Sequence, residues 1–487
     1  MIKRTLSGIL TFIIICLPLL TLQGCGGSGN TGSADTTAIT AAETEFDPYY
    51  GLERKDFNGK TFTMLTRAAC ENVIYVEEDS GDALNDAVKS RNRAVEERYN
   101  ITIKSVPKPN EWEQRNEFLA TITSSVLAGD GAFDIVQGYA ATIGAGFEAG
   151  IYLNLNEIDS LRLDQPWWSE IIRDELTVNG ILYAITGDIA YDLWANTHVI
   201  YFNKVLSDSY KLESPYEAVT SGKWVYDLYL SMLTGLYSDV NGDSKSGEED
   251  SFGAVYYDSL SFDNFHNAFG VPYTRHNDDG SVSLDNYNEK IIAISEKVYD
   301  LALNNTDIYF TNGDVLSTRD TALNIFMGGR GLFLHTTLTY SSRLRAMDDD
   351  FGILPYPKGD EAQERYYTAS RDGRSMFTIP IDVADPEFSG FIAEALCTLS
   401  RSEVIPVYHD IVLKGKTARD EDSQVMLDII REGIILDFAA EYAVQTERAG
   451  FIIRDCIQGK QEIASFYAAN KTKQETAFAK FLEAYKI

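Results

Sequence analysis

The sequence predicts an α/β fold, because segments with the pattern of strands alternate with segments with the pattern of helices. Residues 60–66 are rich in β-branched and aromatic side chains, as strands are. Residues 82–99 repeat apolar positions such as Leu84 and Val88 among charge pairs four residues apart, which indicates an amphipathic helix. Residues 101–106 predict a second strand. Strands and helices that alternate in this way form a largely parallel sheet.

The alternation continues along the chain. Residues 110–128 predict a helix that stops at Gly129, and FDIV at 133–136 predicts a short buried strand. Asn-Gly at 179–180 marks a tight turn. Further strands are expected at 199–204, 252–257, 331–335, 351–354 and 375–381, and further helices at 227–236, 290–303 and 388–399. The chain contains no repeat of fixed period.

The amino terminus has the pattern of an export signal. Lys3 and Arg4 precede an almost wholly apolar run at 6–22, and the run ends in Leu-Gln-Gly-Cys at 22–25. This ending resembles a bacterial lipobox, which implies that residues 1–24 are a signal peptide and that Cys25 becomes a lipidated first residue. The alternative is a membrane-spanning anchor, since about 20 apolar residues suffice to cross a bilayer.

Residues 25–55 are expected to be the lipidated cysteine and a flexible tether. Residues 26–46 are Gly, Ser, Thr, Ala and acidic residues without aliphatic periodicity, so they bury too little apolar surface to order themselves. A lipid anchor, a tether and a folded body predict a protein on the extracellular face of the cell membrane. No later segment has 18 consecutive apolar residues.

The length and composition of the remainder are those of a globular protein. The whole chain has 487 residues, of which 44% are hydrophobic, and the body is long enough for two or three domains. Removal of Lys3 and Arg4 with the signal leaves 40 basic against 73 acidic residues, a net charge of −33. This charge argues against nucleic acid as a partner and against electrostatic binding to anionic lipids.

Cysteines and histidines give no sign of a transition-metal or redox site. Cys70, Cys397 and Cys456 lack CxxC spacing, and we favour buried free thiols over one disulfide. The five histidines lack ligand spacing, and we interpret each as structural; they are His198, His266, His276, His335 and His409.

A set of motifs in order resembles bacterial extracellular solute-binding proteins of family 1, the oligosaccharide-binding lipoproteins of ABC importers. The motifs are DALNDAVKSRNRAVEERYNI (82–101), FDIV (133–136), AGIYLNLNEI (149–158), NGILYAITGD (179–188), VIYFNKVL (199–206), GKWVYDLYLSML (222–233) and FGILPYPKGD (351–360). The resemblance covers nearly the whole mature chain. It implies a monomer that captures a solute, most simply an oligosaccharide, and delivers it to ABC transporter permease subunits without catalysis.

The resemblance also implies a two-lobed, type II periplasmic-binding-protein-like fold. Each lobe is expected to be a mostly parallel sheet flanked by helices, with hinge crossings between the lobes. Mapped onto this chain, residues 56–188 form the first part of lobe 1 and 189–335 the first part of lobe 2. Residues 336–374 return to lobe 1, and 375–487 complete lobe 2.

Residues after the predicted strands are candidates for ligand binding, because open α/β sheets bind ligands beyond the carboxyl ends of their strands. Sugars stack on aromatic rings while polar groups take up their hydroxyls. The candidates are Tyr139, Asp188, Tyr191, Trp194, Tyr340 and Arg371. The alternative for the aromatic residues is core or hinge packing, which we favour for Trp167, Trp168 and Trp224. Arg371 and Arg374 could instead pair with surface carboxylates.

Residues 239–250 have the oxygen spacing of a calcium loop. Side-chain oxygens at Asp239, Asn241, Asp243 and Asp250 and the carbonyl of Lys245 occupy the ligand positions, and the spacing resembles a dockerin-type loop. We expect one structural calcium ion; the alternative is a solvated acidic turn. Otherwise no cofactor is expected.

Two other classes of function stay open. A surface glycan-binding or adhesion lipoprotein would bind without a transporter. An exported glycosidase would need only two carboxylates at the right separation, which a sequence rich in Asp and Glu does not exclude. No GxSxG, P-loop or GxGxxG motif is present.

Overall fold

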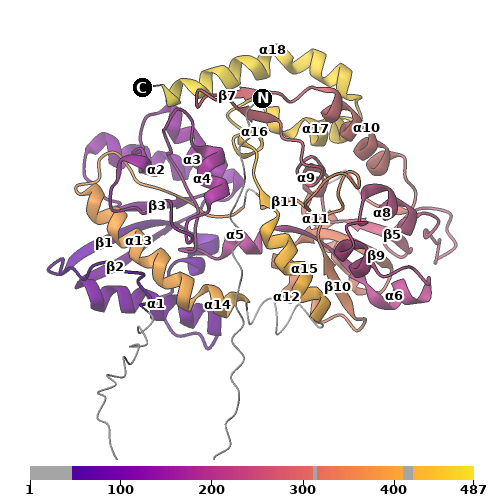
Figure 1. Cartoon of the computed structure of the whole chain (residues 1–487), viewed down its shortest axis with the longest axis horizontal. Coiled ribbons are helices and arrows are strands. Elements are labelled where there is room, and N and C mark those ends of the chain that lie inside the picture. The colour runs from indigo at the N-terminus through magenta and orange to yellow at the C-terminus, as the bar shows by residue number, and fades with distance from the viewer. Residues whose placement is uncertain (1–46, 311–314, 372, 410–420, 487) are drawn as a thin grey trace, which may run out of the picture. The chain divides into compact units, whose positions relative to one another are not determined.

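The computed structural model describes residues 47–310, 315–371, 373–409 and 421–486 (Figure 1). The predicted signal peptide 1–24, Cys25 and the tether up to residue 46 lie outside the described residues, so export and lipidation stay predictions. The end of the predicted tether differs from expectation. Tyr49 and Leu52 are buried, and the ring of Tyr49 packs edge-on against that of Tyr99. Among the described helices, none is both long and apolar enough to cross a membrane.

The first sheet contains four strands in the order β12-β3-β1-β2. They are β1 (Lys60–Arg67), β2 (Ile101–Lys108), β3 (Ile135–Gly138) and β12 (Met376–Thr378). β1 runs parallel to β2 and β3, and β12 runs antiparallel to β3. Phe62 and Met64 of β1 are fully buried.

Two pairs of helices cover this sheet. α1 (Ala83–Tyr99) packs against α13 (Pro386–Glu403), and α2 (Arg115–Ala128) packs against α3 (Ala140–Glu148). Figure 1 shows the two pairs on opposite faces of the sheet. The helix expected at 110–128 begins only at Arg115, because Gln114 has non-helical backbone angles after a 3₁₀ turn. α4 (Glu170–Leu176) and α14 (Ile405–Val407) belong to the same half.

The second sheet contains five strands in the order β10-β4-β9-β5-β8. They are β4 (His198–Asn203), β5 (Phe252–Tyr256), β8 (Ile308–Tyr309), β9 (Gly331–Thr337) and β10 (Phe351–Leu354). β5 is parallel to β8 and β9, whereas β4 is antiparallel to β9 and β10. The sheet is therefore mixed rather than mostly parallel, because the chain enters it through β4 against the direction of β9.

Helices surround the second sheet and link it to the rest of the chain (Figure 1). They are α6 (Lys204–Ser209), α7 (Pro215–Thr220), α8 (Tyr226–Leu233), α9 (Leu260–Ala268), α10 (Glu289–Leu303), α11 (Val315–Met327), α12 (Ser341–Leu344) and α15 (Glu421–Glu432). Two small sheets pair β6 (Thr274–His276) with β7 (Val282–Leu284), and β11 (Thr368–Ala369) with β13 (Ile434–Ile435).

Two neighbouring segments cross between the sheets. The first, residues 185–197, includes α5 (Asp192–Ala195) and leads into β4. The second, residues 370–377, leads into β12. They run antiparallel, with bridges between Ile185 and Phe377 and between Thr197 and Ser370. We call them the crossing pair.

The crossing pair corrects two of the predicted boundaries. The sequence places 336–374 in lobe 1, but β10 within that range pairs with β4 of the second sheet. It places 375–487 in lobe 2, but β12 pairs with β3, and α13 packs against α1. The residue pattern of a strand indicates whether the strand is buried, but it does not indicate which sheet the strand joins. The predicted return to lobe 1 at residue 336 is therefore too early, since the chain crosses back at residues 370–377.

The carboxyl-terminal segment contacts both halves. α16 (Phe438–Glu441), α17 (Ile452–Gly459) and α18 (Ile463–Phe481) follow β13, and α18 packs on α10 and α17. Beyond α18, the ring of Tyr485 lies 5.3 Å from that of Tyr183, whose hydroxyl donates to the carbonyl of Ala484. Figure 1 shows α18 running from the side of α10 to the side of α3.

Candidate functional site

The first sheet presents a guanidinium and an aromatic ring where its parallel strands end. Arg67 is the last residue of β1, and Tyr139 directly follows β3. The Arg67 guanidinium lies over the Tyr139 ring, 5.1 Å from its centroid. Both residues are buried. The predicted position of Tyr139 after a strand is therefore correct, and its ring is held by an arginine that the sequence did not single out.

The second sheet presents a similar group at the ends of β5 and β9. Tyr257 and Asp258 directly follow β5, and Tyr340 follows β9. The hydroxyls of Tyr257 and Tyr340 are hydrogen-bonded. Arg319 of α11 donates to Asp258 at 2.9 Å and stacks on Tyr257. Arg371 approaches the same Asp258 oxygen at 3.4 Å.

The crossing pair joins these two groups. Arg67 donates to the carbonyl of Gly373 at 2.7 Å, and Arg371 donates its backbone N–H to the carbonyl of Asn196. Arg374, fully buried, forms an ion pair of 2.5 Å with Glu441. We define the strand-end site as the following residues: Arg67, Tyr139, Tyr257, Asp258, Arg319, Tyr340, Arg371 and Arg374.

The electrostatics of the site favour an ionised Asp258. Burial raises the pKa of this carboxyl, but Arg371 and Arg319 outweigh burial and hold the pKa below its ordinary value. Burial and the Tyr340 hydroxyl raise the pKa of Tyr257, so the Tyr257 phenol stays a neutral hydrogen-bonding group. The site offers fixed donors, one shared carboxylate and three aromatic rings, which suits binding of a hydroxyl-rich ligand.

A small pocket of about 60 Å³ adjoins the strand-end site. Arg371, Glu441, Asp263 and Arg454 are among its lining residues. Arg454 of α17 donates to Asp263 of α9. Burial raises the pKa of Asp263 to about 6 in spite of Arg454.

A much larger pocket, of about 930 Å³, lies beside the other part of the crossing pair. Trp168, Asp188 and Trp194 line it together with residues of α14 and α15. Asp188 accepts a hydrogen bond of 3.0 Å from Arg401, and burial raises its pKa to about 6. We call this the large pocket.

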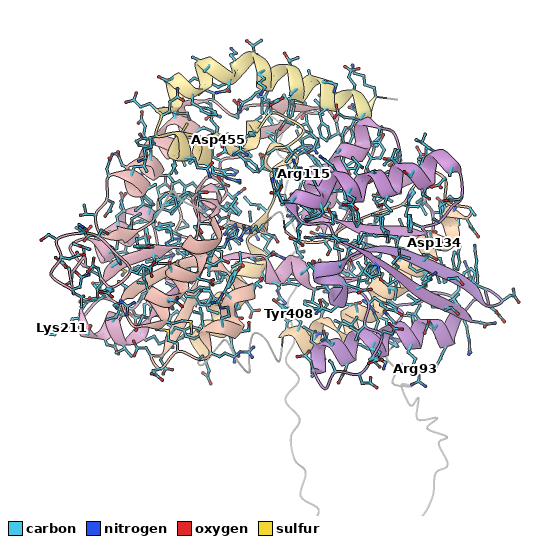
Figure 2. The ribbon with its side chains drawn as sticks, turned by 180° about the vertical axis from the view of Figure 1, so that it is seen from behind. Arg93, Arg115, Asp134, Lys211, Tyr408 and Asp455 are labelled. Carbon is cyan, nitrogen blue, oxygen red and sulfur yellow. The ribbon has the colours of Figure 1, made fainter. Side chains whose placement is uncertain are left out.

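The six predicted ligand residues divide between these places. Tyr139, Tyr340 and Arg371 belong to the strand-end site, and Asp188 and Trp194 line the large pocket. Tyr191 lines neither pocket. It is buried, and its ring stacks on that of Tyr408, which is labelled in Figure 2, at 5.3 Å. The structure therefore does not bring the six side chains together in one place.

Sequence reasoning did not select five members of the strand-end site: Arg67, Tyr257, Asp258, Arg319 and Arg374, the last of which was considered only for pairing with a surface carboxylate. Arg67, Tyr257 and Asp258 each lie at the end of a predicted strand, so the rule that selected Tyr139 would have found them. Arg319 lies within α11 and carries no such signal. Trp112, beyond β2, is a further unassigned aromatic; it is 48% exposed and stacks on Arg115, labelled in Figure 2.

The three tryptophans for which core packing was favoured are buried. Trp167, Trp168 and Trp224 are at most 2% exposed. The indole nitrogens of Trp167 and Trp168 both donate to the buried Glu394 of α13. Arg371 and Arg374 do pair with carboxylates, but in the interior and not at the surface.

The histidines and cysteines have the following surroundings. His335 and His266 are buried against Tyr256 and Tyr273, and burial lowers the pKa of both. His276 lies 3.3 Å from Glu175, His198 lines the small pocket and His409 lines the large pocket. Cys70, Cys397 and Cys456 are free, as predicted. No group of three or more His, Cys, Asp or Glu side chains in the described part of the chain is placed to hold a metal.

The predicted calcium loop folds around its own carboxylates. Asp239 accepts from the backbone of Gly242 and Ser244, and Asp243 accepts from that of Lys245. Asp250 is fully buried and accepts from Val240 and Gly247. These bonds hold the carboxylates within the loop, and calcium binding stays a prediction.

Comparison with known proteins identifies the fold. No protein-family model and no curated protein sequence matches the chain. Among solved structures, it is similar to a maltose/maltodextrin-binding domain from Bdellovibrio bacteriovorus bound to maltotriose, with 15% identity and a TM-score of 0.54 over 86% of this chain and 99% of that one. The chain has the two-lobed fold of ABC-transporter solute-binding proteins.

Two further structures support this fold. An ABC substrate-binding protein from Listeria monocytogenes in complex with cycloalternan has 12% identity and a TM-score of 0.54, over 88% of this chain and 98% of that one. UgpB from Mycobacterium tuberculosis in complex with glycerophosphocholine has 12% identity and a TM-score of 0.53, over 87% and 98%. In this fold the first and second sheets are the two lobes.

Proposed function

We propose that this protein is an extracellular solute-binding protein, lipid-anchored through Cys25, that captures an oligosaccharide and delivers it to the permease subunits of an ABC importer. The observation that carries the proposal is the strand-end site, where Arg67 and Tyr139 of one lobe and Tyr257 and Tyr340 of the other meet the crossing pair. The similar structures contain maltotriose and cycloalternan, which supports a sugar as the ligand.

The mechanism would need no covalent chemistry. A ligand that touches side chains of both lobes binds a closed arrangement more tightly than an open one, and it shifts the population by that difference in affinity. The crossing pair is the natural place for the backbone rotations of such a movement, since it contains two of the chain's connections between the sheets. The permease would then recognise the closed form.

Binding and closure are testable together. A thermal-shift screen of oligosaccharides, amino acids, peptides and glycerophosphodiesters identifies ligands, because a ligand that binds only the folded state raises the melting temperature. X-ray scattering with the best ligand should then show a smaller radius of gyration. A saturated protein whose scattering profile is unchanged would contradict closure.

The anchor is tested separately. Cys25→Ser should release the protein into the medium or leave it unprocessed, while the body binds its ligand as before. A single acyl chain holds a protein to a membrane only marginally, so the diacylglyceryl group implied by the lipobox matters for retention. Unchanged membrane association of the Cys25→Ser protein would point to a spanning anchor.

Two rival functions have distinct signatures. A surface glycan-binding lipoprotein would bind without closing and would lack neighbouring permease genes. A glycosidase would release reducing sugar from its ligand, which a colorimetric assay detects. The structural neighbours are binding proteins, which favours transport over hydrolysis.

A further inference from the structure

The strand-end site is rich in arginine although the protein as a whole is strongly acidic. The chain carries a formal net charge of −31, yet four of the eight residues in the site are arginines: Arg67, Arg319, Arg371 and Arg374. They come from both lobes and from the crossing pair. Guanidinium groups present planar pairs of N–H donors that match carboxylate and related oxyanions bidentately.

Arg67 is the most informative of these residues. It is only 6% exposed, and its Nε–H has no hydrogen-bond partner. Its nearest carboxylate, Glu111, lies 3.8 Å away with a side chain 59% exposed to solvent. It also contacts the Gly373 carbonyl and the Tyr139 ring, and its charge opposes the rise that burial causes in the pKa of the Asp192 carboxyl. Buried charges are normally paired and fully hydrogen-bonded, so this guanidinium has unused capacity for an anion.

The second lobe and the crossing pair also bring guanidinium groups to the site. Arg319 and Arg371 both approach one oxygen of Asp258, at 2.9 and 3.4 Å, so two guanidinium groups share a single carboxylate. Arg374 pairs with Glu441, but its buried Nε–H also lacks a hydrogen-bond partner.

We infer that the ligand carries a negatively charged group, a carboxylate or a sulfate, which is bound at Arg67 beside the ring of Tyr139. This inference rests on the proposed function and narrows its ligand to acidic oligosaccharides, such as those that contain uronic acid. An oxygen of the anionic group accepts a hydrogen bond from the Nε–H of Arg67, a group that has no other hydrogen-bond partner. The sugar rings reach towards Tyr257 and Tyr340 of the other lobe.

The acidic exterior makes such a site selective. The net negative charge of the protein repels anions in general. An anionic ligand therefore binds only if its charged group contacts the arginines of the site directly. A neutral sugar can take the unpartnered Nε–H of Arg67 but brings no charge, whereas an acidic sugar adds a direct negative charge to a guanidinium whose ion-pair partner Glu111 is 3.8 Å away. The structure therefore predicts discrimination between an acidic oligosaccharide and its uncharged counterpart.

The test is an array of neutral, uronate-containing and sulfated oligosaccharides, followed by calorimetry with the best binder at 50 and 500 mM NaCl. Trigalacturonate and its methyl ester form a matched pair with the same sugar rings, in which the charged carboxylates are replaced by neutral methyl esters, and sulfated disaccharides separate sulfate from carboxylate. We expect the best binder to be acidic, at least tenfold tighter than its neutral counterpart, and weaker at the higher salt concentration.

Variants assign this preference to the site. Arg67→Gln should reduce affinity for the acidic ligand about tenfold or more and remove most of the discrimination against its neutral counterpart. Arg319→Gln, at a partly exposed position, provides a second test if Arg67→Gln folds poorly. The matched control is Arg93→Gln, because Arg93 is an exposed residue of α1 paired with Glu97 (Figure 2).

Each outcome decides a different point. A neutral best binder, or an acidic one whose discrimination survives in both Arg67→Gln and Arg319→Gln, overturns the inference and leaves the proposed function intact. An array on which nothing binds contradicts the proposed function itself. An acidic best binder that loses its discrimination in Arg67→Gln but not in Arg93→Gln supports both.

Discussion

The strand-end site and the large pocket share the crossing pair but differ in what they offer a ligand. The large pocket, of about 930 Å³, is lined by tryptophan and aliphatic side chains, by charged residues such as Glu170, Asp428 and Arg431, and by the partly exposed ion pair Asp188–Arg401. The strand-end site gathers four arginines and three tyrosines from both lobes. Recognition depends on convergent polar groups as much as on volume, so we expect the ligand at the strand-end site, where the polar groups come from both lobes.

The ion pairs of the two regions make the difference concrete. The side chains of Arg374 and Glu441 are 1% and 3% exposed, whereas those of Asp188 and Arg401 are 7% and 40% exposed. The strand-end site therefore holds fixed charges away from water. The large pocket leaves its arginine partly solvated.

The largest expected effect is on stability. Glu441→Ala leaves Arg374 buried without a counter-charge, so it should lower the free energy of unfolding by about 3–5 kcal/mol. Asp188→Ala should cost less, because Arg401 keeps its contact with water. Urea denaturation measures both. The double change Arg374→Met with Glu441→Leu should recover much of the loss; equal losses for Glu441→Ala and Asp188→Ala would remove the distinction between the regions.

The second effect depends on pH. Burial raises the pKa of Asp188 from 3.8 to about 6, so the folded protein holds this proton more tightly than the unfolded chain. The resulting stability is fully present below about pH 4 and is lost as pH rises through about 6. The unfolding free energy of the wild type relative to Asp188→Asn should therefore fall by up to about 3 kcal/mol between pH 4 and 7.

Asp258 provides a control of opposite sign. Its pKa is lowered by Arg371 and Arg319, so its stabilising contribution is present above about pH 4 and is lost as pH falls further. Relative to Asp258→Asn, the wild type should lose stability only in acid. The same pH trend for both variants would show that the two carboxyls do not differ in environment as described.

The third effect is on ligand affinity. Tyr340→Ala removes a ring and a hydroxyl from the strand-end site and should weaken binding by about 2 kcal/mol, roughly 30-fold, as is typical of aromatic anchors. Trp194→Ala, in the large pocket, should change affinity less than about twofold. Isothermal titration with the ligand found by screening measures both. The reverse order would move the binding site to the large pocket.

The smallest expected effect comes from the loop at 239–250, which lies outside both the strand-end site and the large pocket. If it binds calcium, titration of chelated protein should release or absorb heat, and Asp243→Ala should abolish that heat. Ligand affinity should be the same with and without the ion. No heat in the wild-type protein would leave the loop as an acidic turn.

Local patterns in the sequence predicted most elements close to their observed bounds. Phe351–Leu354 is a strand as expected, and α1 and α10 begin within a residue of the predicted helices. These elements are ordered by their own periodicity and caps. Asp82, for example, accepts the backbone N–H groups of Leu84 and Asn85 at the start of α1.

The site was predicted only in part, because its members meet through tertiary contacts. The rule that ligands lie beyond strand ends selected Tyr139 and Tyr340, which do follow β3 and β9. It could not show that Tyr191 turns towards Tyr408, or that Trp194 lines a different pocket from Arg371. Arg319 comes from the interior of α11, and only the folded structure brings it to Asp258.

All strands of the second sheet lie within residues 198–354. The first sheet is complete only when β12, at Met376–Thr378, has been added. During synthesis the second sheet therefore has all its strands before the first does, although the first sheet begins nearer the amino terminus. Contacts between β3 and β12 span more than 200 residues, and such long-range pairing slows folding. The lobe that starts first is thus expected to be the one completed last.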